Sequence, residues 1–327
     1  MDPTAADVPE SHTKTSWVAN DRSKHSRRFD LFFAKATFLA GWGTVVLLAW
    51  IAFQIGYAAW PAFQKFQFGF IVGQNWDPNS DIYGALPLIY GTAVSSALAL
   101  LIATPLGVAI AIFLTEDYLP PAVQDFFKFT VELLAAIPSV IYGLWGIFVI
   151  IPITTPIGNW LNDHMGWCPL FSTPSYGPGF FPASFVLAIM VLPTIAALSR
   201  TALRTTPIAT KEGALALGAT RWEVIWQISL PMASTGIVGA AVLALGRAMG
   251  ETMALAMLVG NNNQISASLF APANTIASLL ANSFGEASGL QVAALMYLSF
   301  ILMALTLAIN AIAEVVLERT GANRQRG

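Results

Sequence analysis

The residues with the most distinctive chemistry are Arg247 and Glu251, which stand in the otherwise uncharged run LALGRAMGETM. Their spacing would place both on one face of a helix. At about 1.5 Å per residue, Arg247 would lie about 24 Å along a helix that begins near Pro231. If this helix crosses a bilayer, the arginine costs on the order of 3 kcal/mol and is expected to face a bundle interior or an aqueous cavity. Gly246 and Gly250, at small-xxx-small spacing, would let another helix or a substrate approach closely.

Two interpretations of this pair remain open. In the first, Arg247 and Glu251 form a buried ion pair that fixes the packing of helices or subunits. In the second, Arg247 offers positive charge to an anion halfway across the membrane, because a planar guanidinium donates paired hydrogen bonds to a tetrahedral oxyanion. Glu251 would then orient Arg247 and weaken its field, so that the anion can leave. The hydroxyl of Thr252 would bond either the passing anion or its own backbone.

The elements that must position these residues are membrane spans. Of the 327 residues, 56% are hydrophobic and only 10% are charged, whereas about a quarter of a soluble protein is charged. A spanning helix needs about 20 apolar residues, and long uncharged windows predict an all-α membrane protein, a bundle of six transmembrane helices. The predicted spans are residues 38–57, 88–114, 127–151, 181–203, 232–259 and 290–316.

Two further features are expected in the third span. Lys128 and Glu132 are expected to form an interfacial ion pair, and Pro138 is expected to kink the helix.

The distribution of Lys and Arg predicts the orientation of the bundle. The side shared by both termini would hold most of the positive charge, including Arg200, Arg204 and Lys211, and the opposite side would hold only Lys65. By the positive-inside rule, both termini are expected in the cytoplasm. The predicted organisation is an amino-terminal tail (1–30), one transmembrane domain (31–318) with a cytoplasmic loop (205–231), and a carboxy-terminal tail (319–327).

Several other classes of protein are excluded by what the chain lacks. Cys168 is the only cysteine and the three histidines are scattered, so neither an intrachain disulfide nor a metal site is expected. Blocks of basic residues interleaved with aromatics, which would indicate nucleic acid, are missing. The chain has no GxxxxGK[ST] loop and hence no ATP site of its own. It is therefore not expected to be an enzyme or to hold a cofactor.

Residues 211–231, KEGALALGATRWEVIWQISLP, predict a compact helix–turn–helix on the cytoplasmic side. Gly218 would make the turn, and Pro231 would end or kink the second helix. Periodicity alone leaves open whether this loop docks on a partner or lies on the lipid surface. The loop resembles the EAA loop of ABC-importer permeases, which forms a coupling helix in a cleft of the ATPase subunit. The matching residues are Glu212, Ala214, Gly218, Ile228, Leu230 and Pro231, with Gly213 where the family usually has alanine.

Three further stretches resemble the PstC permeases of phosphate ABC importers. They are residues 83–116, ELLAAIPSVIYGLWG from Glu132, and GRAMGETMALAMLVGN from Gly246. Met253 and Ala254 favour this family over the sister PstA permeases, which usually have proline after the GET sequence. With the EAA loop, the resemblance covers about residues 31–318. It implies a type I ABC-importer permease fold, and it implicates the residues that match Arg247 and Glu251 in phosphate transport.

The function implied by this resemblance is a transmembrane permease subunit of an ATP-driven, high-affinity phosphate importer in the bacterial inner membrane. The implied partners are a PstA-type permease, a PstB-type ATPase dimer that binds ATP and Mg²⁺, a PstS-type phosphate-binding protein and membrane lipid. Two alternatives remain open. One is a permease for another oxyanion, such as sulfate, molybdate or phosphonate, and the other is a non-transporting membrane scaffold or sensor.

Overall fold

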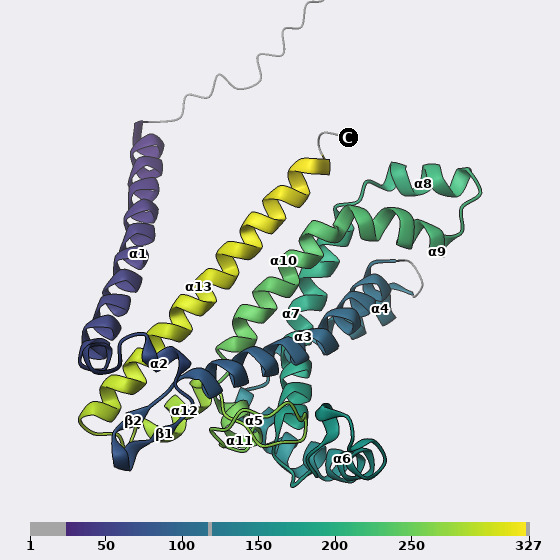
Figure 1. The fold of residues 1–327 in the computed structure, drawn as a ribbon. Coiled ribbons are helices and arrows are strands. Elements are labelled where there is room, and N and C mark those ends of the chain that lie inside the picture. Colours follow the sequence, from purple (N-terminus) through teal and green to yellow (C-terminus); the bar gives the residue numbers. More distant parts are fainter. Residues whose placement is uncertain (1–23, 117–119, 325–327) are drawn as a thin grey trace, which may run out of the picture. The chain divides into compact units, whose positions relative to one another are not determined.

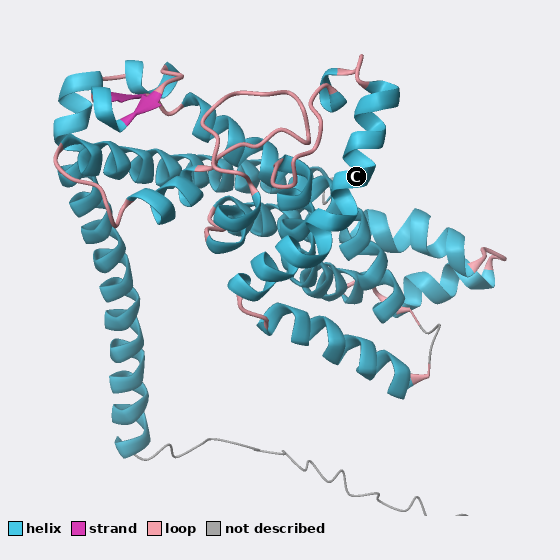
Figure 2. Ribbon diagram, turned by 90° about the horizontal axis from the view of Figure 1, so that it is seen from below, coloured by secondary structure: helices cyan, strands magenta, loops and turns pink. Residues whose placement is uncertain are grey.

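A computed structural model describes residues 24–116 and 120–324 of the chain, with side chains over 31–116 and 120–315. These residues are mainly helical, with one short antiparallel strand pair (Figures 1 and 2). The strands are β1 (Trp76–Asp77) and β2 (Ile82–Tyr83). The helices are α1 (Lys24–Phe66), α2 (Gly69–Val72), α3 (Leu86–Thr115), α4 (Pro121–Ala136), α5 (Ser139–Trp145), α6 (Ile151–Met165), α7 (Phe180–Arg204), α8 (Ile208–Ala216), α9 (Arg221–Val224), α10 (Leu230–Met249), α11 (Met253–Leu258), α12 (Ile276–Ser283) and α13 (Leu290–Arg324), with 3-10 turns at Pro78–Ser80 and Pro169–Phe171 and π-helical segments at Gly146–Ile150 and Ile225–Ser229.

Six helical segments of the described residues are long and apolar enough to cross a membrane, which confirms the predicted number. Four of them coincide with predicted spans, and the third and fifth are displaced. The short helix α12 lies in the polar loop that follows the fifth span. The six segments are Leu31–Phe66, Leu86–Thr115, Ser139–Met165, Phe180–Arg204, Arg221–Met249 and Leu290–Val315.

The predicted third span, 127–151, is wrong at both ends. Helix α4 ends at Ala136. The next two residues, Ile137 and Pro138, are extended, with ψ of 128° and 140°. A new helical path then runs from Ser139 to Met165. Proline has no N–H to donate and disfavours helical geometry in the residue before it. The kink expected at Pro138 is therefore a complete break between an amphipathic helix and the span.

Helix α4 is a separate amphipathic element with polar contacts of its own. Its Lys128 forms an ion pair with Asp125 in the preceding turn, so the expected pairing with Glu132 is wrong. Across the break, the hydroxyl of Tyr142 in α5 donates to the carbonyl of Leu134 at 2.8 Å. The same carbonyl accepts the N–H of Ile137 at 3.5 Å, so the two bonds together satisfy it at the end of α4.

The predicted fifth span, 232–259, is displaced toward the amino terminus. The helical path runs without interruption from Arg221 to Met249, through α9, the π-helical segment and α10. Pro231 lies in the first turn of α10 and does not end the helix. The wider π turn directly before it displaces the carbonyls that a proline ring would meet in a regular α-helix.

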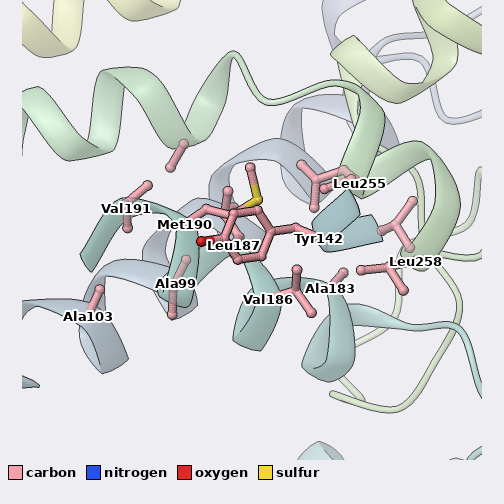
Figure 3. Close-up of a cluster of buried hydrophobic side chains, with 14 of the residues drawn as sticks. Ala99, Ala103, Tyr142, Ala183, Val186, Leu187, Met190, Val191, Leu255 and Leu258 are labelled. Atoms are coloured by element: carbon pink, nitrogen blue, oxygen red, sulfur yellow. The ribbon is translucent and has the colours of Figure 1, made fainter. Parts of the chain in front are cut away.

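The chain divides into two units, residues 1–53 and 54–327. In the second unit, α3, α7 and α10 pack against one another (Figure 1). Small residues bring α3 and α7 close together, since a Cβ at Gly107 would lie 2.7 Å from Cγ2 of Ile195. The larger buried cluster joins these helices to α5 and α11, and Figure 3 shows the ring of Tyr142 beside Leu187 and Met190.

The predicted tails fall largely outside the described residues. Residues 1–23 of the amino-terminal tail are not described, and the boundary predicted at 30 lies within α1. Similarly, α13 continues past the boundary predicted at 318, and residues 325–327 are not described.

Candidate functional site

Arg247 lies in the last turn of α10, and Glu251 lies beyond the end of that helix. The predicted shared helix face is therefore wrong, and Arg247 and Glu251 form no ion pair in the part of the chain that is described. The carboxylate of Glu251 instead accepts a hydrogen bond from the backbone N–H of Ala254, at 3.4 Å in the first turn of α11. A polar side chain that bonds nearby backbone in this way favours a helix boundary over a continuous helix.

The boundary between α10 and α11 is made by Gly250, Glu251 and Thr252. The hydroxyl of Thr252 donates to the carbonyl of Gly250 at 3.1 Å. Of the two roles expected for this hydroxyl, the structure thus shows the bond to its own backbone. The N–H of Glu251 donates to the carbonyl of Ala248 at 3.3 Å, which tightens the last turn of α10. The fifth span thus ends at Met249, two residues after Arg247.

The guanidinium of Arg247 contacts the neighbouring helix α7. Its Nη1 donates to Oγ1 of Thr194 at 3.2 Å, and Thr194 directly follows Pro193 in that helix. Arg247 is exposed in this chain, so its side chain is not enclosed between helices of its own subunit. Among the residues that the structure describes, no ion pair compensates the charge of Arg247.

The wall behind Arg247 is built from small side chains. Ala244, about one turn before Arg247, and Ala248, the next residue after it, are fully buried in the same cluster as Ala99 and Ala103 of α3. A Cβ at Gly246 would lie 3.5 Å from Oδ1 of Asn310 on α13, whereas a Cβ at Gly250 would meet only the backbone of its own turn. Gly246 therefore serves helix packing, and Gly250 leaves open space beside the arginine.

The predicted helix–turn–helix is present as α8 and α9, and we call residues 208–229 the coupling hairpin after the role that the sequence predicts for them. Gly218 has a φ of +93°, a conformation that disfavours residues with a Cβ. The N–H groups of Gly218 and Ala219 donate to the carbonyls of Leu215 and Ala214, which is the pattern of a Schellman motif.

A capping box begins the second helix of the coupling hairpin. The N–H of Thr220 donates to the carboxylate of Glu223 at 2.7 Å, and the N–H of Glu223 donates back to the Thr220 hydroxyl at 3.3 Å. The two reciprocal bonds satisfy orphan donors at the start of the helix. The turn is thus fixed on both sides, from α8 and from α9.

The predicted coupling residues divide into two groups in the structure. Glu212, Gly213 and Gly218 are exposed on the hairpin and Ala214 is half-buried, whereas Ile228, Leu230 and Pro231 are half-buried in the stem that continues into α10. Helix α8 buries no side chain in this chain, and Leu217 at the tip is 91% exposed. Exposed apolar side chains on one short hairpin, including Ile208 (72% exposed) and Leu217, indicate a surface that a partner or lipid covers.

Two contributors to these sites were not singled out from the sequence. Thr194 is 53 residues from Arg247 and had no local motif to identify it. Leu217 has no motif that marks it within the predicted helix–turn–helix, because its exposure depends on how α8 packs. The Thr220–Glu223 box could have been recognised from its spacing.

Comparison with known proteins agrees with this architecture. Residues 103–320 match the family described as "Binding-protein-dependent transport system inner membrane component". The chain is 41% identical over 311 residues to the "Phosphate transport system permease protein PstC" of Pasteurella multocida, covering 94% of this chain and 96% of that protein. It is 42% identical over 314 residues to the protein of that name from Mesorhizobium japonicum, covering 93% and 96%. It is 38% identical over 318 residues to "PstC 2" of Mycobacterium tuberculosis, covering 94% and 98%.

Solved structures show the same fold at low sequence identity. A bacterial ABC transporter that imports the acidic polysaccharide alginate superposes with a TM-score of 0.57 at 18% identity, covering 90% of this chain and 98% of that chain. A second structure of an alginate ABC transporter, in complex with a periplasmic protein, gives 0.58 at 18% identity, covering 90% and 96%. The chain is therefore an inner membrane component of a binding-protein-dependent transport system, with the permease fold of ABC importers. Within that class, it belongs to the PstC family of permeases.

Proposed function

We propose that this chain forms half of the pathway by which an ABC importer carries inorganic phosphate across the bacterial inner membrane. The observation that carries the proposal is Arg247, a cation in a spanning helix that its own subunit leaves exposed. Curated relatives about 40% identical over nearly the whole chain are named for phosphate transport. A permanently charged guanidinium with a fixed fork of donors suits the tetrahedral phosphate oxyanion.

Thr194 and Glu251 would tune this site in different ways. The Thr194 hydroxyl orients the guanidinium without neutralising it, since a hydroxyl carries no charge. Glu251, held at the start of α11, adds a negative charge near the arginine and would weaken its hold on phosphate, so that the anion can leave. Thr252 bonds its own backbone, which favours a role in ending the helix over contact with the anion.

The energy for transport would come from a separate ATPase that binds ATP and Mg²⁺. The rigid coupling hairpin, with its exposed Leu217, supports docking of this chain in a cleft of such a partner. The other proposed partners are a PstA-type permease, a PstB-type ATPase dimer and a PstS-type binding protein. The hairpin and both termini would face the cytoplasm, as the distribution of Lys and Arg predicts.

Uptake of radiolabelled phosphate by cells that lack this chain, with and without the wild-type gene restored, tests the proposal. Restored uptake that excess sulfate, molybdate or phosphonate does not suppress would support phosphate as the cargo. Suppression by one of these anions at equal concentration would assign that oxyanion instead. Equal uptake in both strains, with the restored chain present in the assembled complex, would favour a scaffold or sensor.

A further inference from the structure

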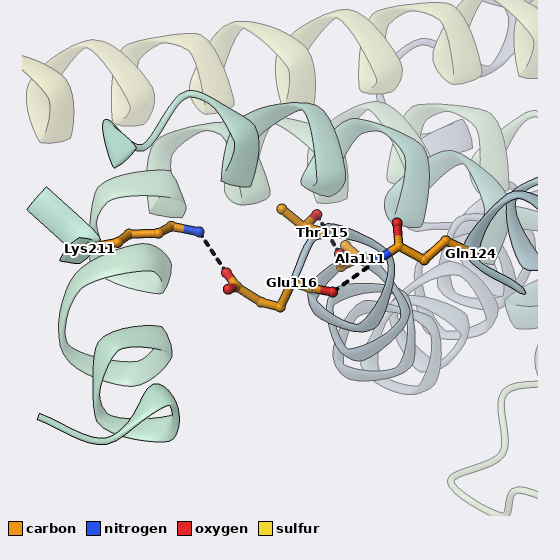
Figure 4. Close-up of polar contacts among 5 residues, drawn as sticks. All are labelled: Ala111, Thr115, Glu116, Gln124 and Lys211. Carbon is orange, nitrogen blue, oxygen red and sulfur yellow. Dashed lines mark hydrogen bonds and ion pairs between the residues drawn. The ribbon is translucent and has the colours of Figure 1, made fainter. Parts of the chain in front are cut away.

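Glu116 and Lys211 form an ion pair that joins the end of α3 to the coupling hairpin. Nζ of Lys211 donates to Oε1 of Glu116 at 2.6 Å, across 95 residues of sequence (Figure 4). The two side chains are only 21% and 19% exposed, respectively. Because the pair is largely shielded from water, it interacts more strongly than a fully exposed pair of the same length.

Glu116 also connects α3 to α4 through its backbone. It is the first residue after α3, and its carbonyl accepts a hydrogen bond from Nε2 of Gln124 at 3.3 Å (Figure 4). Helix α4 in turn packs on α7. One residue at the end of a span thus contacts α8 with its side chain and α4 with its main chain.

Helix α8 itself has few other attachments to the bundle. Among the described residues, α8 makes one side-chain hydrogen bond, from Lys211 to Glu116. None of the side chains of α8 is buried. The hairpin continues covalently into α10 through α9 and the π-helical segment. A force on α8 therefore reaches α10 through the chain. It reaches α3 indirectly through the packing of α10 on α3, and directly through this ion pair.

Helix α3 forms part of the wall behind Arg247. Its Ala99 and Ala103 lie in the same buried cluster as Ala244 and Ala248 of α10. If α10 moved alone, this closely packed interface would have to slide, because packed interiors do not deform continuously. A second attachment would let both helices move with the docked hairpin.

We propose that the Glu116–Lys211 ion pair is a coupling element, which makes α3 move with α10 when a partner ATPase displaces the coupling hairpin. Both residues are positioning residues: they act through α3 on the pathway and do not touch the transported anion. The inference rests on the proposed function, because it assigns a step in energy coupling to a permease that an ATPase drives.

The test uses the assembled complex of this chain with its second permease, ATPase and binding protein in proteoliposomes. Phosphate uptake and ATP hydrolysis are measured together for Glu116→Gln, for Lys211→Met and for the charge-swapped double variant Glu116→Lys/Lys211→Glu. Each single variant should transport about tenfold less phosphate per ATP hydrolysed, within the ordinary range of coupling free energies. The amount of copurified ATPase should stay unchanged, and the double variant should recover most of the transport.

Asp125→Asn provides the matched control. Asp125 and Lys128 form an ion pair within α4, and the hydrogen bond from Lys128 lowers the pKa of the Asp125 carboxyl below its ordinary value. Because this pair joins two turns of a single helix, its loss should leave the ratio of phosphate to ATP unchanged.

Three results would overturn the inference: wild-type ratios in the single variants, loss of the ATPase from them, or a double variant no better than the singles. The second result would mean that the pair only stabilises the hairpin. A wild-type complex that moves no phosphate would instead contradict the proposed function. In that case, the measured quantity is the stimulation of ATP hydrolysis by the binding protein. If the single variants keep wild-type stimulation, the coupling role of the ion pair is contradicted.

Discussion

Nη1 of Arg247 lies 3.2 Å from Oγ1 of Thr194, so the arginine of the fifth span is held by the fourth span and not by Glu251. A hydroxyl orients a guanidinium and leaves its charge intact, whereas a carboxylate partner would cancel much of that charge. The positive charge beside Gly250 is therefore positioned yet uncompensated within the described residues of the chain. This relationship leads to the first two predictions.

Replacing Arg247 by glutamine should abolish phosphate uptake, with a fall of at least about a hundredfold, because removing a charged hydrogen-bond donor costs about 3 kcal/mol or more. Arg247→Lys keeps the charge and loses the planar fork, and should retain partial uptake. Uptake in whole cells and copurification of the ATPase are measured together. Arg204→Gln, at the exposed end of α7, is the matched control. Near-normal uptake by Arg247→Gln in an intact complex would leave a packing role for the arginine.

Thr194→Val should weaken transport because it removes the acceptor that orients Arg247, while Thr194→Ser keeps that acceptor. A single hydrogen bond to a charged group contributes about 1.5–3 kcal/mol. The valine variant should therefore need a phosphate concentration roughly tenfold or more higher for half-maximal uptake, and the serine variant should behave like wild type. Equal transport by both variants would show that the Thr194 contact does not position the guanidinium.

The turn of the coupling hairpin predicts opposite outcomes for two glycines. Gly218→Ala should weaken binding of the ATPase, because a Cβ at a φ of +93° costs on the order of 1–2 kcal/mol. Gly213→Ala should stabilise α8 by about 0.5–1 kcal/mol, since a Cβ there meets no atom within 4 Å. Affinity of the detergent-solubilised permease for the ATPase measures both effects. A tight complex with Gly218→Ala would show that the turn can adopt another geometry.

Leu217 should be a principal contact between the hairpin and its ATPase. Leu217→Asp places a charge in the apolar contact and should prevent copurification of the ATPase, whereas Leu217→Met conserves volume and should not. Because the side chain is 91% exposed in this chain, neither change should reduce the amount of folded permease in the membrane. If the aspartate variant keeps a full complement of ATPase, the partner surface must lie elsewhere on the hairpin.

The six spans and the hairpin could be predicted from the sequence because uncharged length and turn residues are local properties. The third span could not be placed correctly, since the residues before Pro138 are apolar enough to resemble a span and only the extended Ile137 reveals the break. The Arg247–Glu251 geometry was also predicted wrongly. The four-residue spacing places the two side chains on one face only if the helix is unbroken. Here Glu251 and Thr252 form the hydrogen bonds at the boundary between α10 and α11. Thr194 required the packing of α7 on α10, which no local pattern encodes.

The uninterrupted helical path from Arg221 to Met249 has a mechanical consequence. Arg221 at the hairpin and Arg247 are separated by 26 residues, or roughly 39 Å of helix at about 1.5 Å per residue. The two arginines thus stand near opposite ends of one lever. A rigid tilt of about 5° around the hairpin end would swing the guanidinium by roughly 3 Å over such a length. That distance is comparable to one hydrogen bond. In the proposed function, a small rotation at the ATPase would therefore suffice to offer the charge to the transported anion or to withdraw it.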